Sequence, residues 1–197
     1  MRSVAKKVLG GVAAVVLVAG AVIGIGQAIY ERRLDADVNA LLGASTERAS
    51  RVITEANLAT LPEPVQRWLR WAQVVGKPIP TTIHLKQTGR FKLSETGGWM
   101  PFTAEETYTT DPPGFVWKTS MQMFPLVSII GRDQYVDGHG SIQMRVLGIV
   151  PVADAAGPAM DQGALLRYLN ETIWFPAAAS PRTSPGTPPT PPRPAPP

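Results

Sequence analysis

Three carboxylates are the side chains of this sequence best placed for acid–base chemistry. Glu106 shares the parity of Phe102 in a stretch of alternating residues, which predicts that it lies on the buried face of a strand. A desolvated glutamate can serve as a general acid or base, although pairing with an arginine is the favoured explanation. Asp154 precedes a predicted helix that Asp161 is expected to cap, and Glu171 lies within that helix. Glu106, Asp154 and Glu171 are therefore the candidate catalytic residues.

Other reactive groups are sparse. The two histidines, His84 and His139, have no companions at metal-ligand spacing, and there is no cysteine to supply a thiolate. No phosphate-binding loop and no G-x-S-x-G motif is present. Asp111, Asp133 and Asp137 are assigned to turns, where aspartate accepts backbone hydrogen bonds. The sequence predicts no metal site and no cofactor.

An alternating set of aromatic and methionine residues suggests a different kind of site. Its members are Phe115, Trp117, Met121 and Met123. Flat rings and flexible methionines suit a lipid-like guest, so this parity is a candidate apolar ligand pocket between sheet and helix. A plain hydrophobic core explains the same pattern and is the favoured alternative.

The elements that must position these residues are strands with a period of two. Successive strand segments are predicted within 81–93, 102–109, 115–123, 127–130, 134–136 and 142–148, with turns near 95–98, 111–114 and 137–140. Short connections favour hairpins, so the sheet should be an antiparallel meander. Helices are predicted at 64–76 and at 161–175, the second with Leu165 and Leu169 on its packed side. The fold class is α+β.

The N-terminal region is dominated by an uninterrupted apolar stretch from Val8 to Ile29. Its 22 residues make a helix of roughly 33 Å, enough to cross a bilayer. A signal peptide cleaved near Ala28 is the alternative. Basic residues before the stretch favour a cytoplasmic N-terminus and an extracytoplasmic remainder. Gly20 and Gly24 match a helix-dimer spacing, although small residues are common in such helices and the oligomeric state stays open.

The basic net charge does not indicate nucleic-acid binding. Residues 1–33 hold five Lys or Arg and one Glu, which leaves fourteen residues of each sign in the remainder. The remainder is neutral and lacks the basic stripe that phosphate contacts require. Nucleic acid is excluded as a partner, whereas the bilayer is expected to be one.

Composition divides the chain into four segments: a transmembrane anchor at 1–33, a helical stalk at 34–60, a sheet-rich domain at 61–178 and a proline-rich tail at 179–197. From Ser180 to Pro197, nine of eighteen residues are proline and none is a large apolar residue. Such a composition cannot form a packed core, so the tail is predicted to be disordered or polyproline-like.

Four ordered segments carry a resemblance to a known family. They are LPEPVQRWLRWAQVVGKP, TTDPPGFVW, GRDQYVDGHG and PVADAAGPAMDQGALLRYLNETIWFP. Over about residues 58–178 the chain resembles a bacterial family of membrane-anchored proteins catalogued as a domain of unknown function. The resemblance implies an extracytoplasmic, sheet-rich domain and no particular activity. Members of that family continue with further strands, which implies that this chain is truncated and its curved sheet incomplete.

These observations lead to an expected function and two alternatives. We expect an envelope-associated or binding module on a single membrane span, with an apolar molecule as the candidate ligand. A hydrolase or transferase that uses buried carboxylates is the first alternative. A nonfunctional fragment, with an unpaired sheet edge and an uncovered apolar face, is the second.

Overall fold

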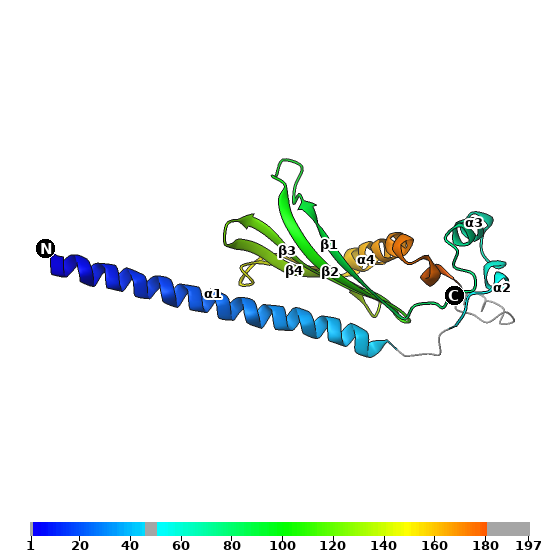
Figure 1. The fold of residues 1–197 in the computed structure, drawn as a ribbon, viewed down its shortest axis with the longest axis horizontal. Coiled ribbons are helices and arrows are strands. Elements are labelled where there is room, and N and C mark those ends of the chain that lie inside the picture. Colours follow the sequence, from blue (N-terminus) through cyan, green and yellow to red (C-terminus); the bar gives the residue numbers. More distant parts are fainter. Residues whose placement is uncertain (1, 46–50, 181–197) are drawn as a thin grey trace, which may run out of the picture. The chain divides into compact units, whose positions relative to one another are not determined.

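The computed structural model describes residues 2–45 and 51–180, which fall into two compact units (Figure 1). Of the described residues, one unit contains 2–45 and 82–169, and the other contains 51–81 and 170–180. The predicted proline-rich tail lies, from residue 181 onward, outside the described residues.

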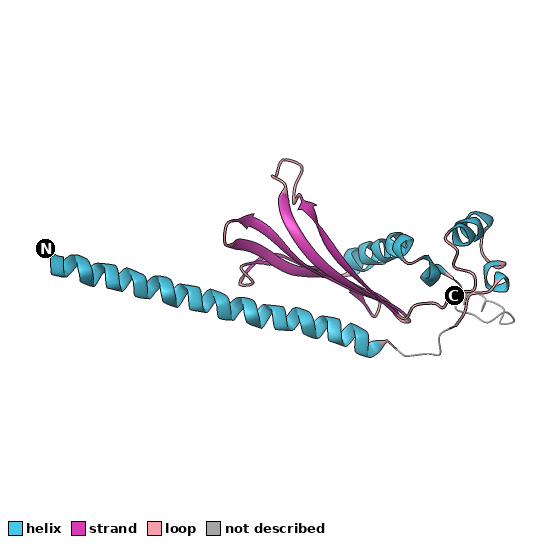
Figure 2. Cartoon of the chain, viewed as in Figure 1, coloured by secondary structure: helices cyan, strands magenta, loops and turns pink. Residues whose placement is uncertain are grey.

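The first unit is built on a six-stranded antiparallel sheet that connects each strand to the next along the chain (Figure 2). The strands are β1 (Thr82–Phe91), β2 (Met100–Thr110), β3 (Pro113–Phe124), β4 (Val127–Val136), β5 (His139–Val146) and β6 (Val150–Ala156). The sheet is open, with β1 and β6 at its edges in the described part of the chain. The predicted α+β meander is confirmed, and β6 is an additional strand that alternation did not indicate.

The strand register separates the side chains into two faces. Directly opposite residues share a face, so the pairs Glu106–Trp117 and Trp117–Asp133 define one side. We call this side the aromatic face; it carries Phe91, Phe102, Glu106, Tyr108, Phe115, Trp117, Met121, Asp133 and Gly140. The other side is the polar face, which carries Lys86, Glu105, Val116, Lys118, Ile130, Arg132 and Gln143.

Helix α1 (Arg2–Ala44) is continuous over 43 residues. Its segment Leu9–Ala44 is long and apolar enough to cross a membrane, a property that a signal sequence near the N-terminus shares. The helix passes residue 33 without interruption, so the predicted boundary between anchor and stalk is not a break in secondary structure. It ends at Ala44, within the predicted helical stalk.

The C-terminal part of α1 packs on the polar face. Leu34 and Tyr30 form a small buried cluster with Ile130 of β4. The Lys118 ammonium forms an ion pair of 2.6 Å with Asp35. The same helix therefore carries both the apolar N-terminal stretch and a stretch that is attached to the sheet by apolar and ionic contacts.

Helix α4 (Pro158–Glu171) packs on the aromatic face through Ala164 and Tyr168, which are both buried. The Tyr168 hydroxyl donates to the carbonyl oxygen of Thr109 at 3.0 Å. The prediction that Leu165 and Leu169 face the sheet is wrong, because these side chains are 38% and 54% exposed.

The start of α4 lies against the backbone of β5. A Cβ on Gly140 would lie 2.2 Å from the carbonyl oxygen of Met160, so this close approach requires glycine. Asp161 accepts a hydrogen bond of 2.7 Å from the Gly140 amide. The predicted role of Asp161 as the helix cap is wrong: the helix begins at Pro158, and Asp161 binds the neighbouring strand.

The second unit is small and helical. It contains α2 (Glu55–Leu58), α3 (Glu63–Trp71) and the 3-10 turns η1 (Thr172–Trp174) and η2 (Pro176–Ala179). Its core consists of Ile53, Leu58, Leu69 and Val74. The helix predicted over 64–76 ends at Trp71, because Gln73 adopts a left-handed conformation with φ of 55°.

Candidate functional site

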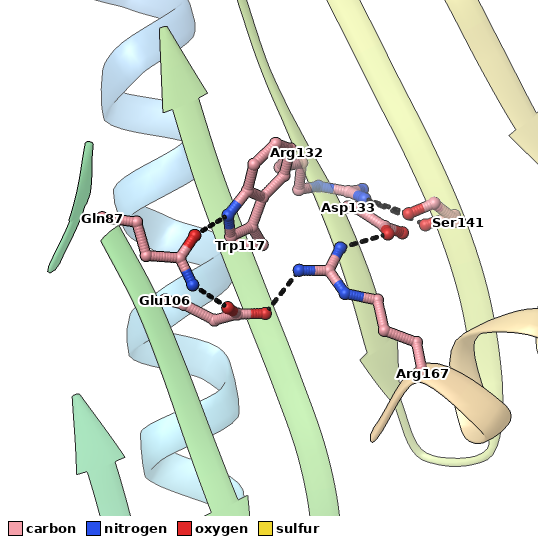
Figure 3. Close-up of polar contacts among 7 residues, drawn as sticks. All are labelled: Gln87, Glu106, Trp117, Arg132, Asp133, Ser141 and Arg167. Atoms are coloured by element: carbon pink, nitrogen blue, oxygen red, sulfur yellow. Dashed lines mark hydrogen bonds and ion pairs between the residues drawn. The ribbon is translucent and has the colours of Figure 1, made fainter. Parts of the chain in front are cut away.

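The most elaborate polar arrangement on the aromatic face centres on Arg167 of α4 (Figure 3). Its Nη2 donates to Glu106 Oε1 at 2.7 Å, and its Nη1 donates to Asp133 Oδ2 at 2.6 Å. Glu106 is fully buried, and Arg167 is three-quarters buried. The guanidinium therefore joins one helix to two strands through charge-assisted hydrogen bonds.

Two neutral side chains extend this arrangement. Gln87 of β1 donates from Nε2 to the second oxygen of Glu106 at 2.9 Å, and Trp117 donates from Nε1 to Gln87 Oε1 at 2.8 Å. Figure 3 shows the resulting chain from Trp117 through Gln87 and Glu106 to Arg167 and Asp133. We call these five residues the Arg167 network.

Aromatic rings lie beneath the guanidinium. Its Cζ atom is 4.8 Å from the centre of the Phe115 ring and 5.1 Å from that of Trp117. A cation over two ring faces is stabilised by their quadrupoles, and Arg is the residue most often used in this way. The charge of Arg167 is thus balanced by carboxylates on its edge and by rings on its face.

The sheet register explains why these residues meet. Glu106, Trp117 and Asp133 occupy directly opposite positions on β2, β3 and β4. Arg167 is on the packed side of α4, between Ala164 and Tyr168. Asp133 was predicted to lie in a turn, which is wrong, because it lies within β4. Its shared parity with Tyr135 was the signal that could have placed it on the buried face.

The surroundings of Glu106 favour a structural role, in an internal ion pair, over a role in proton transfer. Each of its carboxylate oxygens accepts a hydrogen bond, one from Arg167 and one from Gln87. These contacts fix the carboxylate in an ion pair inside the fold, which is a structural role. Glu106 is paired with an arginine, as the sequence favoured, and its catalytic role stays a prediction.

The other two candidate carboxylates lie elsewhere. Asp154 is exposed on β6, pairs in register with Gln143, and accepts a hydrogen bond of 3.3 Å from it on the polar face. Glu171 is the last residue of α4. Asp154 and Glu106 point to opposite faces of the sheet, so these two carboxylates do not form one catalytic pair.

The four residues of the predicted apolar pocket differ in their surroundings. Phe115 is fully buried, with its ring 6.0 Å from that of Tyr108. Trp117 and Met121 are also buried. Met123 is half-buried, in an irregularity of the register between Gln122 and Phe124.

The aromatic face continues beyond Trp117 toward the β1–β2 hairpin. The Trp117 ring lies 6.2 Å from Phe102 and 6.4 Å from Phe91. Phe91 and Phe102 meet edge to face at 6.2 Å. Phe91 is 36% exposed, whereas Phe115 is sealed under the helix, so access to this face is from the Phe91 side.

A groove of about 500 Å³ lies on the polar face, between α1 and strands β1 to β4. Its lining includes Glu31 and Asp35 of α1 with Lys86, Glu105 and Lys118 of the sheet. The two lysines are ion-paired, Lys86 with Glu105 at 3.4 Å and Lys118 with Asp35 at 2.6 Å. Charged side chains line part of this groove, which lies on the opposite face of the sheet from the predicted apolar pocket residues Phe115, Trp117 and Met121.

The described residues contain no group of three or more His, Asp or Glu side chains that could hold a metal ion. His84 lies 3.1 Å from the Thr107 hydroxyl, and His139 lies 3.6 Å from Asp161. Each histidine thus has a local polar partner.

The fold and site define an α+β protein with an open antiparallel sheet and an N-terminal helix that could span a membrane. The chain belongs to a family of unknown function (DUF6544), whose model matches residues 51–183. The family resemblance inferred from the sequence is thereby confirmed. No curated protein and no solved structure matches the chain.

Proposed function

We propose that this protein is a single-pass membrane protein whose sheet serves as an extracytoplasmic binding module for an apolar, lipid-like ligand. The observation that carries this proposal is the aromatic cluster of Phe91, Phe102 and Trp117 at the accessible side of the aromatic face. Rings of this kind, with few polar groups, are typical of sites for apolar molecules.

The topology follows from the N-terminal charges. Lys6 and Lys7 precede the apolar stretch Val8 to Ile29, so the positive-inside rule favours a cytoplasmic N-terminus. The sheet is then extracytoplasmic. The absence of cysteine agrees with a domain that folds without disulfides after export.

The Arg167 network has a supporting role in this proposal. It fixes α4 over one part of the aromatic face, where Tyr108 and Phe115 are covered. The ligand is therefore assigned to the remaining part, next to Phe91, Phe102 and Met123. Of the predicted pocket residues, Phe115 belongs to the covered core, and Trp117 and Met121 form the floor of the site.

Photo-crosslinking tests this proposal. The full chain is reconstituted in nanodiscs with a diazirine-labelled fatty acid, illuminated, digested and mapped by mass spectrometry. We expect crosslinks in the peptides that carry Phe91, Phe102 and Met123. Phe91→Glu should reduce them about tenfold, because a charge in an apolar site is costly. Trp71→Ser, an exposed position of the second unit, is the control and should leave them unchanged.

Crosslinks confined to α1 would count against the proposal, because the lipid annulus around a membrane helix produces them without any binding site. Equal crosslinking of Phe91→Glu and of the unmodified chain would also refute it.

A further inference from the structure

The two ends of the sheet differ in the composition of their turns. The β2–β3 and β4–β5 connections are polar and contain Asp111, Asp137 and Gly138. The β1–β2, β3–β4 and β5–β6 connections emerge at the opposite end, which we call the apolar end. The large apolar residues of these three connections are Leu93, Trp99, Leu126, Leu147 and Ile149.

The apolar end presents its side chains outward. Leu126 is 93% exposed and Trp99 is 59% exposed, and Phe124 and Leu93 are also exposed. Isolated exposed apolar residues are common, but several at one end of a sheet mark an interaction surface. The turns at the other end of the same sheet are polar, so exposed apolar side chains are not a general property of its turns.

The backbone gives a second, independent sign. Leu126 has φ of 66°, a left-handed conformation that usually belongs to glycine or asparagine. Leu147, in the β5–β6 turn, has φ of 53°. A leucine that stands exposed at a strained turn position implies that its apolar side chain has a use outside the fold.

Contacts with α1 locate the apolar end along that helix. The position that a Cβ on Gly26 would occupy is 2.8 Å from the Ile149 side chain. At the other end of the sheet, a Cβ on Gly114 would lie 2.8 Å from Leu41. The sheet therefore lies beside the C-terminal part of α1, with its apolar end next to the last turns of the stretch Val8 to Ile29.

The β3–β4 turn reaches a similar position along the axis of α1. Ile130 of β4 packs with Leu34, and Leu126 precedes Ile130 by four strand residues, a length of about 13 Å. Nine helical residues also span about 13 Å. Measured back from Leu34 along α1, this distance reaches Ile25, inside the apolar stretch.

The charges near the apolar end suit a bilayer surface. The Lys92 ammonium lies 5.9 Å from the centre of the Trp99 ring. The Arg145 guanidinium lies 5.1 Å from that of Tyr30, at the end of the apolar stretch. Tryptophan and tyrosine next to basic side chains are typical of the headgroup region, where rings and cations are both accommodated.

We propose that the apolar end of the sheet is a lipid-contact surface, on which Phe124 and Leu126 enter the outer leaflet while Trp99 and Lys92 lie among the headgroups. This inference rests on the membrane topology proposed above but does not require the apolar ligand. It assigns one occupant, the bilayer in which α1 is anchored, because α1 holds these turns at the level of that bilayer.

Site-directed fluorescence tests the contact, and the absence of native cysteine makes single-cysteine variants direct. Phe124→Cys, Leu126→Cys and the distal control Asp137→Cys are each labelled with the environment-sensitive dye NBD in the full chain. The variants are reconstituted in nanodiscs that contain nitroxide-labelled phosphatidylcholine. We expect quenching at Phe124→Cys and Leu126→Cys to exceed that at Asp137→Cys by about threefold or more, as for side chains buried in the acyl boundary.

A fourth variant, Val16→Cys, reports on the anchor itself. Strong quenching at Val16→Cys with none at Phe124→Cys and Leu126→Cys would overturn the lipid-contact surface while the membrane span stands. No quenching at Val16→Cys would overturn the span and the contact together. Probes at 124 and 126 that are shielded from aqueous iodide but not quenched by lipid nitroxide would identify a protein partner or a second copy, which also refutes the proposal.

Discussion

Arg167 joins helix α4 to strands β2 and β4 through both of its terminal nitrogens. Buried ion pairs contribute little net stability relative to apolar packing, but removing one member leaves the other charge buried without compensation. Glu106 would be that residual charge, since it has no exposed surface. Loss of Arg167 alone is thus expected to destabilise the fold, although the intact ion pairs contribute little net stability relative to apolar packing.

Arg167→Ala should lower the free energy of unfolding of the sheet unit by about 3 kcal/mol, because it leaves Glu106 uncompensated. Thermal unfolding of the full chain, followed by circular dichroism in the strand region, measures this loss. Arg67→Ala, which breaks an ion pair between two exposed side chains of α3, is the matched control and should change little. A loss at Arg167→Ala no larger than at Arg67→Ala would show that the network is dispensable.

Leu126→Asn should affect lipid contact without lowering the stability of the fold. Asparagine tolerates a left-handed backbone better than leucine, so stability in detergent should be unchanged or should rise by up to about 1 kcal/mol. Proximity of the β3–β4 turn to lipid should nevertheless decrease, as reported by NBD at Phe124→Cys in the same chain. A fall in stability together with unchanged lipid quenching would contradict both parts of this prediction.

At the residue scale, the sequence located Glu106 but not its partners. Regular alternation through β2 was sufficient to place Glu106 on the buried face. Asp133 was assigned to a turn because Gly131, Arg132 and Gln134 make its surroundings polar, a composition that resembles a turn. Arg167 was not predicted as a partner because an arginine on a helix usually faces solvent. Here it faces the sheet, where it pairs with the carboxylates of two strands that are distant in sequence.

Helix α4 shows the same limitation at the scale of elements. Its leucines suggested one packed side, yet Ala164, Arg167 and Tyr168 are the residues that face the sheet. A small side chain fits this contact because β5 approaches closely at Gly140, and an arginine fits because two carboxylates of the sheet lie opposite it. Hydrophobic periodicity alone cannot reveal a helix face that is chosen by ion pairs and backbone proximity.

Gly140→Val should displace the start of α4 from β5, since its Cβ would overlap the Met160 carbonyl. We expect a loss of about 1–3 kcal/mol in stability, as for other overpacked contacts. Gly138→Asn is the control: Gly138 has φ of 84° with open space around it, and asparagine tolerates that conformation. Protection of the Tyr168 peptide from hydrogen exchange should fall in Gly140→Val only. Equal protection in both variants would exclude the close contact.

The strands were largely predictable, since five of the six follow a clear alternation with turn residues between them. Strand β6 was missed because Pro151 and several alanines give it little strand propensity. It is defined by pairing with β5, a property of the assembled sheet that a local pattern does not contain.

At the scale of the whole molecule, α1 links the proposed membrane span to the sheet without a flexible joint. Its apolar stretch was evident from composition, but its attachment to the polar face was not. Leu34, Asp35 and Asp37 resemble an ordinary solvated stalk until Ile130, Lys118 and Arg132 are placed opposite them. This attachment fixes the position of each end of the sheet along α1.

The central claim is that α1 crosses the membrane uncleaved and leaves the sheet on the extracytoplasmic side. Labelling of the single cysteine in Asp137→Cys with a membrane-impermeant maleimide, in cells whose cytoplasmic membrane is intact, tests it most directly. An N-terminal tag on the same chain reports cleavage. The account predicts labelling without permeabilisation, on a full-length, tagged chain in the membrane fraction. Labelling only after permeabilisation, or a labelled chain that has lost its tag and fractionates as soluble, would contradict it.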